Sequence, residues 1–140
     1  MIIEMYTGMR HTTEYSETLT KEQRKYALEQ MTKQFCELME CSPNENLYWL
    51  GSTTDLLDLA HEVYMTERLV DREGRPFPFK RIVKRACDVL HVPMPSNPYS
   101  MAFNARNRKG VRQTSMFSRY CWQMFFRGSK RPLREMVKRV

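Results

Sequence analysis

Apolar residues at helical spacing predict an amphipathic helix near the start of the chain. Thr20 and Gln23 form a capping box, which marks the beginning of a helix. Four apolar side chains then recur on one face: Leu28, Met31, Phe35 and Leu38. The run Cys41-Ser42-Pro43-Asn44 stops the pattern. We therefore expect one helix over about residues 20–40, within an N-terminal segment 1–46.

A second helix is expected after a short apolar run at residues 47–50, which favours a strand or a tightly buried segment. Ser52, with Asp55 three residues later, is a variant capping signal. The helix that follows has a buried stripe: Leu56, Leu59, Ala60 and Val63. Prolines at 76 and 78 exclude a helix over 69–79, so this segment is predicted to be a turn or the loop of a small hairpin.

The pattern of apolar residues in the second half of the chain predicts four more helices. The first covers about 79–91 and carries basic residues on the face opposite its apolar stripe. The next covers about 98–108, because Asn97 can cap it and Pro98 fits its first position. We expect three of its side chains to face the core: Tyr99, Ala102 and Phe103. The last two are expected over about 114–127 and after Pro132, the latter with Leu133, Met136, Val137 and Val140 on one face.

These elements predict a mainly α protein with short β elements. The helices after Ser52, at 79–91 and at 98–108 are consecutive, and this is the order of a helix-turn-helix domain whose third helix reads DNA. A generic cationic helical bundle has the same pattern. Residues 47–140 are expected to form this domain, preceded by the amphipathic helix.

Charge is distributed very unevenly along the 140 residues. Residues 1–60 carry five basic and ten acidic side chains, whereas residues 61–140 carry eighteen basic and six acidic ones. From Gly74 onward, Asp88 and Glu135 are the only acids against sixteen Lys or Arg, most of them arginine. Arginine suits phosphate oxygens and guanine edges, so this half indicates an anionic partner if its cations converge on one surface. A solvated basic face is the alternative interpretation.

The residues that catalysis or metal binding would require do not form known motifs. No C-x-x-C pair, two-histidine zinc motif, phosphate-binding glycine loop or nucleophile elbow occurs. We expect no catalytic residues, metal or cofactor, and no enzyme activity. No apolar run is long enough for a membrane span, and no secretion signal is evident, so the expected compartment is the cytoplasm.

Cysteines and tryptophans are expected to belong to the core. Cys36, Cys87 and Cys121 lie among apolar residues of predicted helices, where a free cysteine behaves as a small hydrophobic side chain. Trp49 and Trp122 are assigned to the core as well, with stacking on single-stranded bases as the competing role.

Two groups of residues carry a resemblance to a known family: Trp49-x-Gly51-Ser52-x-Thr54-Asp55-Leu56, and Tyr99-x-x-x-Phe103-x-x-Arg106-Asn107-Arg108-Lys109-x-x-Arg112-x-Thr114-x-x-Phe117. Over roughly residues 47–140 the chain resembles the C-terminal domain of RteC-type regulators, DNA-binding proteins of Bacteroides-type conjugative transposons. The resemblance implies a winged-helix domain that activates excision genes by binding upstream DNA. The chain departs from that family at Thr53, where lysine is usual, and in its apolar segment 116–126, where the family has a charged helix.

A helix-turn-helix arrangement assigns roles to individual residues of the basic half. The candidates for base contacts are Asn104, Arg106, Asn107 and Arg108. The candidates for phosphate contacts are Lys80, Arg81, Lys84, Arg85, Lys109 and Arg112. For Arg106, an internal ion pair with Asp88 or Glu62 is the alternative.

The leading hypothesis is a regulator of a mobile element that binds double-stranded DNA, as a homodimer or with another regulatory protein. A second hypothesis is a small scaffold of conjugation or excision machinery, which would dock a partner through the stripe of Leu28, Met31 and Phe35. A third is nonspecific binding of RNA or single-stranded DNA. Salt dependence separates phosphate binding from protein docking.

Overall fold

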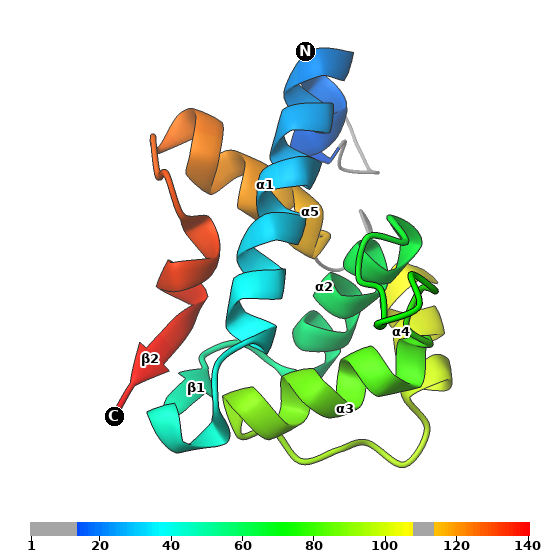
Figure 1. Cartoon of the computed structure of the whole chain (residues 1–140). Coiled ribbons are helices and arrows are strands. Elements are labelled where there is room, and N and C mark those ends of the chain that lie inside the picture. The colour runs from blue at the N-terminus through cyan, green and yellow to red at the C-terminus, as the bar shows by residue number, and fades with distance from the viewer. Residues whose placement is uncertain (1–13, 108–113) are drawn as a thin grey trace.

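The computed structural model describes residues 14–107 and 114–140, which are mainly helical (Figure 1). The α-helices are α1 (Lys21–Met39), α2 (Thr53–Met65), α3 (Phe79–Leu90), α4 (Pro98–Asn107) and α5 (Met116–Cys121). The strands β1 (Leu47–Trp49) and β2 (Val137–Arg139) form a small antiparallel sheet. The mainly α class with short β elements is confirmed; the finer assignment to a winged helix-turn-helix belongs to the proposed function.

Helix α1 begins where its capping box predicts. The Gln23 amide donates to Thr20 Oγ1 at 3.0 Å, and the Thr20 amide donates to Gln23 Oε1 at 2.9 Å. Met31 and Phe35 of the predicted stripe are fully buried, and α1 contacts α2, α3 and α5. This helix therefore shares one hydrophobic core with the rest of the described chain.

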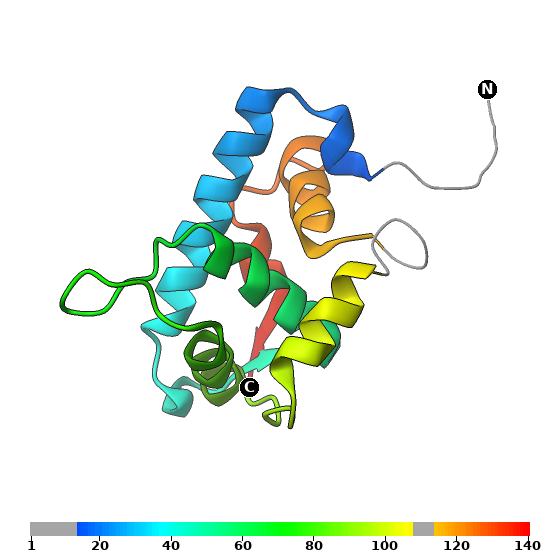
Figure 2. The ribbon, with the colours of Figure 1, turned by 90° about the vertical axis from the view of Figure 1, so that its right-hand side faces the viewer.

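Helix α2 packs against both α3 and α4, which also contact each other (Figures 1 and 2). Ser52 Oγ caps α2 by accepting from the Asp55 amide at 3.0 Å, as predicted. Asn97 Oδ1 caps α4 by accepting from the Ser100 amide at 3.1 Å, and Pro98 is the first residue of α4. The predicted succession of three helices is therefore present, with residues 91–97 joining α3 to α4.

The prediction that Tyr99 and Phe103 face the core is wrong. The buried residues of α4 are Pro98, Ala102 and Ala105, while Tyr99 and Phe103 are 56% and 55% exposed. Small side chains allow α4 to lie close against α2, and a large ring on that inner face would force the two helices apart. The aromatic residues are consequently on the outside of α4.

The prediction of a helix after Pro132 is also wrong. A 3-10 turn at Pro132–Met136 leads into β2, which pairs with β1 in the register Leu47↔Arg139, Tyr48↔Lys138 and Trp49↔Val137. A valine favours extended backbone, and β1 offers unpaired backbone groups to the C-terminal segment. Non-local pairing thus outweighs the helical spacing of the apolar residues in this segment.

The segment between α2 and α3 is a turn, as predicted, and projects from the body of the molecule (Figure 2). An isolated bridge joins Val70 and Pro76. Asp71 Oδ1 accepts from the amides of Glu73 and Arg75 at 2.9 and 3.0 Å. Gly74, with φ +82°, adopts the left-handed conformation that this turn requires.

The helix expected over 114–127 is present in two parts. Ser115 caps α5 by accepting from the Ser118 amide at 3.1 Å, and a π-helical turn continues it over Trp122–Phe126. Cys87 and Cys121 are buried in the core as expected, whereas Cys36 is partly exposed. Burial raises the pKa of Cys121 to about 12, so its thiol is uncharged and packs as an apolar group.

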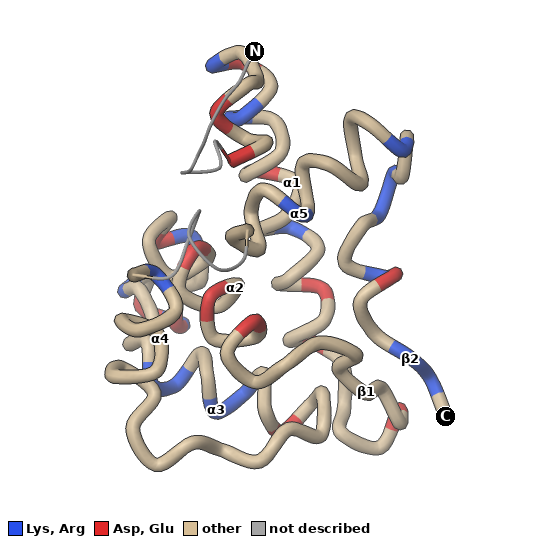
Figure 3. Tube along the Cα trace, turned by 180° about the vertical axis from the view of Figure 1, so that it is seen from behind, with Lys and Arg blue, Asp and Glu red and all other residues tan. Residues whose placement is uncertain are grey.

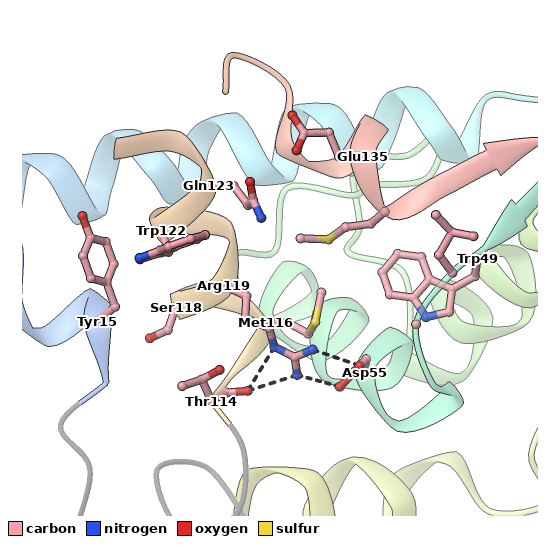
Figure 4. Close-up of a pocket in the computed structure, with 13 residues that line it drawn as sticks. Tyr15, Trp49, Asp55, Thr114, Met116, Ser118, Arg119, Trp122, Gln123 and Glu135 are labelled. Atoms are coloured by element: carbon pink, nitrogen blue, oxygen red, sulfur yellow. Dashed lines mark hydrogen bonds and ion pairs between the residues drawn. The ribbon is translucent and has the colours of Figure 1, made fainter. Parts of the chain in front are cut away.

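A partly buried ion pair fixes α5 against the start of α2 (Figure 4). Arg119 Nη1 and Nη2 donate to the two carboxylate oxygens of Asp55 at 3.0 and 2.7 Å, and Nη2 also donates to the Thr114 carbonyl at 3.0 Å. Burial by itself raises the pKa of Asp55, but the bonds and charge of Arg119, together with Ser52, lower it below its ordinary value. The folded state therefore stabilises the ionised carboxylate.

We expect Asp55→Asn to destabilise the protein by about 2 kcal/mol near neutral pH, because it removes a charged acceptor from a paired guanidinium. Because the pKa of Asp55 is lowered in the folded state, its carboxylate contributes its full stabilisation at pH values above the ordinary aspartate pKa of 3.8. The contribution is lost as the pH falls through the lower folded value, so the difference between wild type and variant should narrow in acid. Urea unfolding at neutral pH and at about pH 3 measures both effects.

Asp88→Asn is the matched control for this prediction. Asp88 pairs with Lys84 on the exposed surface of α3, so its loss should cost about 0.5 kcal/mol or less. Equal destabilisation by the two substitutions would contradict the conclusion that the Asp55–Arg119 pair stabilises the fold more than an exposed ion pair does.

Candidate functional site

The outward side of α4 is the surface on which most of the predicted base contacts can be placed. We call it the α4 outer face; its members are exposed, and they are Tyr99, Ser100, Phe103, Asn104, Arg106 and Asn107. It contains no carboxylate. Polar, aromatic and cationic side chains therefore share one helix surface whose backbone is held in place by α2.

One side of the α4 outer face borders a groove of about 570 Å³. We call it the aromatic groove; its ring-bearing and cationic lining residues are His61, Tyr64, Phe79, Tyr99, Phe103 and Arg106. The Phe79 ring centroid lies 5.4 Å from that of Tyr99 and 5.6 Å from those of Tyr64 and His61. Because Phe79 is itself buried, the exposed Tyr99 ring packs against a side chain that the core holds in place.

Arg106 lies along this groove. Its Nη1 is 2.8 Å from His61 Nε2, and its guanidinium carbon is 5.9 Å from the Phe103 ring centroid. Asp88, one of the two carboxylates considered as its partner, pairs with Lys84. The imidazole of His61 thus orients the guanidinium next to an aromatic ring.

Asn104 lies on the other side of α4, in a separate shallow groove with Thr54 and Pro95. Asn107 follows Phe103 by one helical turn, in the middle of the outer face. Arg108 lies outside the described residues. The base-contact candidates are therefore divided between the two sides of α4, with Phe103 and Asn107 between them.

The phosphate-contact candidates on α3 have different surroundings. Arg85 donates from Nε to the Met39 carbonyl and from Nη2 to the Cys41 carbonyl, both at 2.8 Å. It thereby caps the C-terminal end of α1. Lys84 Nζ pairs with Asp88 Oδ1 at 2.7 Å. These two cations already have partners within the protein.

Arg81 and Lys80 are the remaining candidates on α3. The Arg81 guanidinium lies over the Phe77 ring, 4.8 Å from its centroid. Lys80 is exposed, and no hydrogen bond or ion pair joins it to another residue of 14–107 or 114–140. It follows Phe79, whose ring contacts Tyr99, so it is the α3 cation that we associate with the α4 outer face. Lys109 and Arg112 lie outside the described residues.

The expectation that the cations of the second half converge on one surface is wrong for several of them. Acidic residues of the first sixty positions pair with four arginines of residues 61–140: Glu29 with Arg68, Asp55 with Arg119, Glu37 with Arg131 and Glu45 with Arg139. Figure 3 shows Lys and Arg positions along the C-terminal segment, on the opposite side of the molecule from α4. The acidic N-terminal part folds against the basic part and compensates much of its charge.

A second surface feature is an apolar groove of about 510 Å³, which we call the tryptophan groove (Figure 4). Trp49 and Trp122, the two tryptophans of the chain, both line it, together with Met116 and Met136. Trp49 is partly buried and packs against the core, so its assignment to the core is partly right. Trp122 is partly buried too, but its ring stacks on the exposed Phe126 at 5.0 Å between centroids and it is not part of the core cluster, so its assignment to the core is wrong.

The first group of residues behind the family resemblance surrounds this groove and has structural contacts. Trp49 Nε1 donates to the Ser52 carbonyl at 2.8 Å. A Cβ at Gly51 would lie 3.0 Å from Trp49 Nε1, so this close approach of the indole favours glycine. Asp55 holds Arg119, which reaches Thr114 from the second group. Sequence reasoning identified Asp55 only as a capping residue and missed Arg119.

The stripe of α1 proposed for partner docking is not a free surface. Met31 and Phe35 have no exposed area and belong to the core, and Leu28 is partly buried against it. Within residues 14–107 and 114–140, no cluster of three or more potential metal ligands is present. Among the described helices, none combines the length and apolarity needed to span a bilayer.

Comparison with known proteins adds no relative: no protein family, curated protein or solved structure matches this chain. The resemblance to RteC-type regulators accordingly rests on the quoted residues alone.

Arg85→Ala tests its assignment as a helix cap. We expect a loss of about 1–2 kcal/mol in unfolding free energy, because two carbonyls at the end of α1 lose a charged donor. Binding to any nucleic acid should stay unchanged at temperatures where the variant is folded. Chemical denaturation and fluorescence anisotropy measure the two quantities. Lower affinity with unchanged stability would instead restore Arg85 as a phosphate contact.

Proposed function

We propose that the protein is a DNA-binding regulator that contacts DNA through the α4 outer face. The observation that carries this proposal is the packing of α4. Its small buried residues, Pro98, Ala102 and Ala105, lie inward, and its amide, aromatic and guanidinium side chains project outward. A helix that is rigidly supported and exposes such groups is suited to enter a DNA groove.

The sequence around α4 supports an anionic partner. No Asp or Glu occurs between positions 89 and 134, a stretch that includes all of α4. Arg108, Lys109 and Arg112 follow α4 directly in the sequence and are phosphate or base candidates in the proposal. Unlike Arg119, Arg131 and Arg139, which pair with carboxylates, Arg106 makes its hydrogen bond with the imidazole of His61.

In the proposal, α3 and α4 are the two helices of a helix-turn-helix, and α2 is the helix that supports both. Asn107, in the middle of the outer face, reads adenine, Arg106 and Asn104 contact the DNA from the two sides, and Lys80 binds phosphate. The family resemblance adds a finer assignment to the proposal: a winged-helix domain that controls excision genes of a conjugative transposon.

A protein-interaction role is the second candidate, and the tryptophan groove is the observation that favours it. Leu50 beside this groove is largely exposed, and apolar grooves rimmed by polar residues are frequent docking sites. Docking there should depend only weakly on salt, whereas phosphate binding weakens steeply as the salt concentration rises.

We expect Lys80→Ala to weaken binding to all duplexes alike and to lower the slope of log affinity against log salt by about 0.9, because one phosphate contact is lost. Anisotropy titrations of a labelled duplex at several salt concentrations measure the slope. Lys33→Ala removes another exposed lysine, from α1, and should leave the slope unchanged. If both variants lower it equally, the effect comes from net charge and not from a site near α4.

Asn107→Ala tests base reading by the middle of α4. The variant should lose about 1–3 kcal/mol of discrimination at one adenine position while retaining affinity for unrelated duplexes. Selection from a random duplex pool, with wild type and variant in parallel, identifies the position. Asn44→Ala, in the 3-10 turn at Pro43–Glu45, is the matched control. A variant that selects the same sequences as wild type would remove Asn107 from the readout.

A further inference from the structure

We propose that the aromatic groove binds an unpaired base of the DNA, stacked on Phe103 and Tyr99. This inference rests on the proposed function, since it names the form of DNA that the α4 outer face prefers. It predicts that the preferred substrate is a duplex that carries a bulged or extruded base.

The two rings are placed to accept a flat ligand. Tyr99 and Phe103 are one helical turn apart on the same side of α4, and each is more than half exposed. Tyr99 rests against buried Phe79, which in turn contacts Tyr64 and His61. Since this cluster limits the motion of the Tyr99 ring before a ligand arrives, little side-chain entropy remains to be lost on binding.

The rings distinguish an unpaired base from a paired one. Inside a duplex the faces of the bases are covered by their neighbours, and the grooves present only base edges and backbone. Aromatic side chains contribute most binding free energy when they stack on the face of a base. A base that has left the stack presents this face, as it does in enzymes that extrude their target nucleotide.

Arg106 supplies the polar part of the groove. Its contact with His61 uses Nη1, and a guanidinium carries five N–H donors, so donors remain for a base edge or the adjacent phosphate. The groove volume of about 570 Å³ lies within the range of small-molecule sites. The absence of Asp and Glu from positions 89–134 provides charge complementarity to the phosphates that flank the base.

The test compares three labelled DNAs of one sequence by fluorescence anisotropy at physiological salt: a perfect duplex, the same duplex with one unpaired base, and the single strand. The wild-type chain should bind the second and third at least about tenfold more tightly than the first, because stacking gains are of that order per base. Phe103→Ala should remove most of this preference, because it lowers affinity for the bulged duplex and the single strand more than affinity for the perfect duplex. Phe103→Tyr, which keeps a ring, should restore the preference.

Tyr26→Ala is the matched control, because Tyr26 lies on α1 and its 53% exposure is close to that of Phe103. It should leave all three affinities unchanged. Circular dichroism confirms that each variant is folded, and the exposure of Phe103 makes folding of its variants the expected result.

Several outcomes would overturn the inference. Equal affinity of the wild-type chain for perfect and bulged duplexes contradicts it but leaves the proposed duplex binding intact. A preference that survives Phe103→Ala, or that Tyr26→Ala removes equally, contradicts the assignment to this groove. If no DNA form binds, or if binding occurs only to a protein partner, the proposed function falls together with the inference.

Discussion

The bidentate pair between Asp55 and Arg119 joins the acidic and basic parts of the chain by tying the start of α2 to α5. Arg119 also holds the Thr114 carbonyl, and the next two amides are bound by carboxylates from elsewhere: Ser115 by Glu14 and Met116 by Asp58. The start of α5 is thus fixed by the N-terminal segment and by α2. Because α4 packs on the same α2, α2 connects this junction to the candidate site.

The same pairing decides which positive charges are available to a partner. Arginines that meet a carboxylate of the first sixty residues are used in holding the fold, and Arg85 is used as a helix cap. The large net charge of the second half therefore overstates the charge offered to a ligand. Arg106 and Lys80 differ from these residues, since Arg106 contacts a histidine side chain and Lys80 has no ion pair within the described ranges.

Local signals in the sequence were sufficient for the starts of helices and insufficient for contacts between distant segments. Thr20, Ser52 and Asn97 cap the helices that they predict, because a cap involves only a few neighbouring residues. The C-terminal strand depends on pairing with β1 across about ninety positions, and the capping role of Arg85 depends on carbonyls 44 and 46 positions away. Among the candidate site residues, the helix that carries them was predicted, but their division between two sides of α4 required the packing of α4 on α2.

α4 differs from an ordinary amphipathic helix in that its largest apolar side chains, Tyr99 and Phe103, lie on the exposed face, and folding alone does not explain their position. Close packing on α2 requires small residues at Ala102 and Ala105, but it places no demand on the residues that project outward. Tyr99 packs against Phe79, but a polar side chain at position 103 would satisfy the fold equally and would avoid exposing a second large ring to water. Single exposed aromatic residues are common on protein surfaces, whereas two on one turn beside an oriented arginine form a patch of the kind that marks binding sites. The rings are therefore better explained by what the α4 outer face binds than by what stabilises α4.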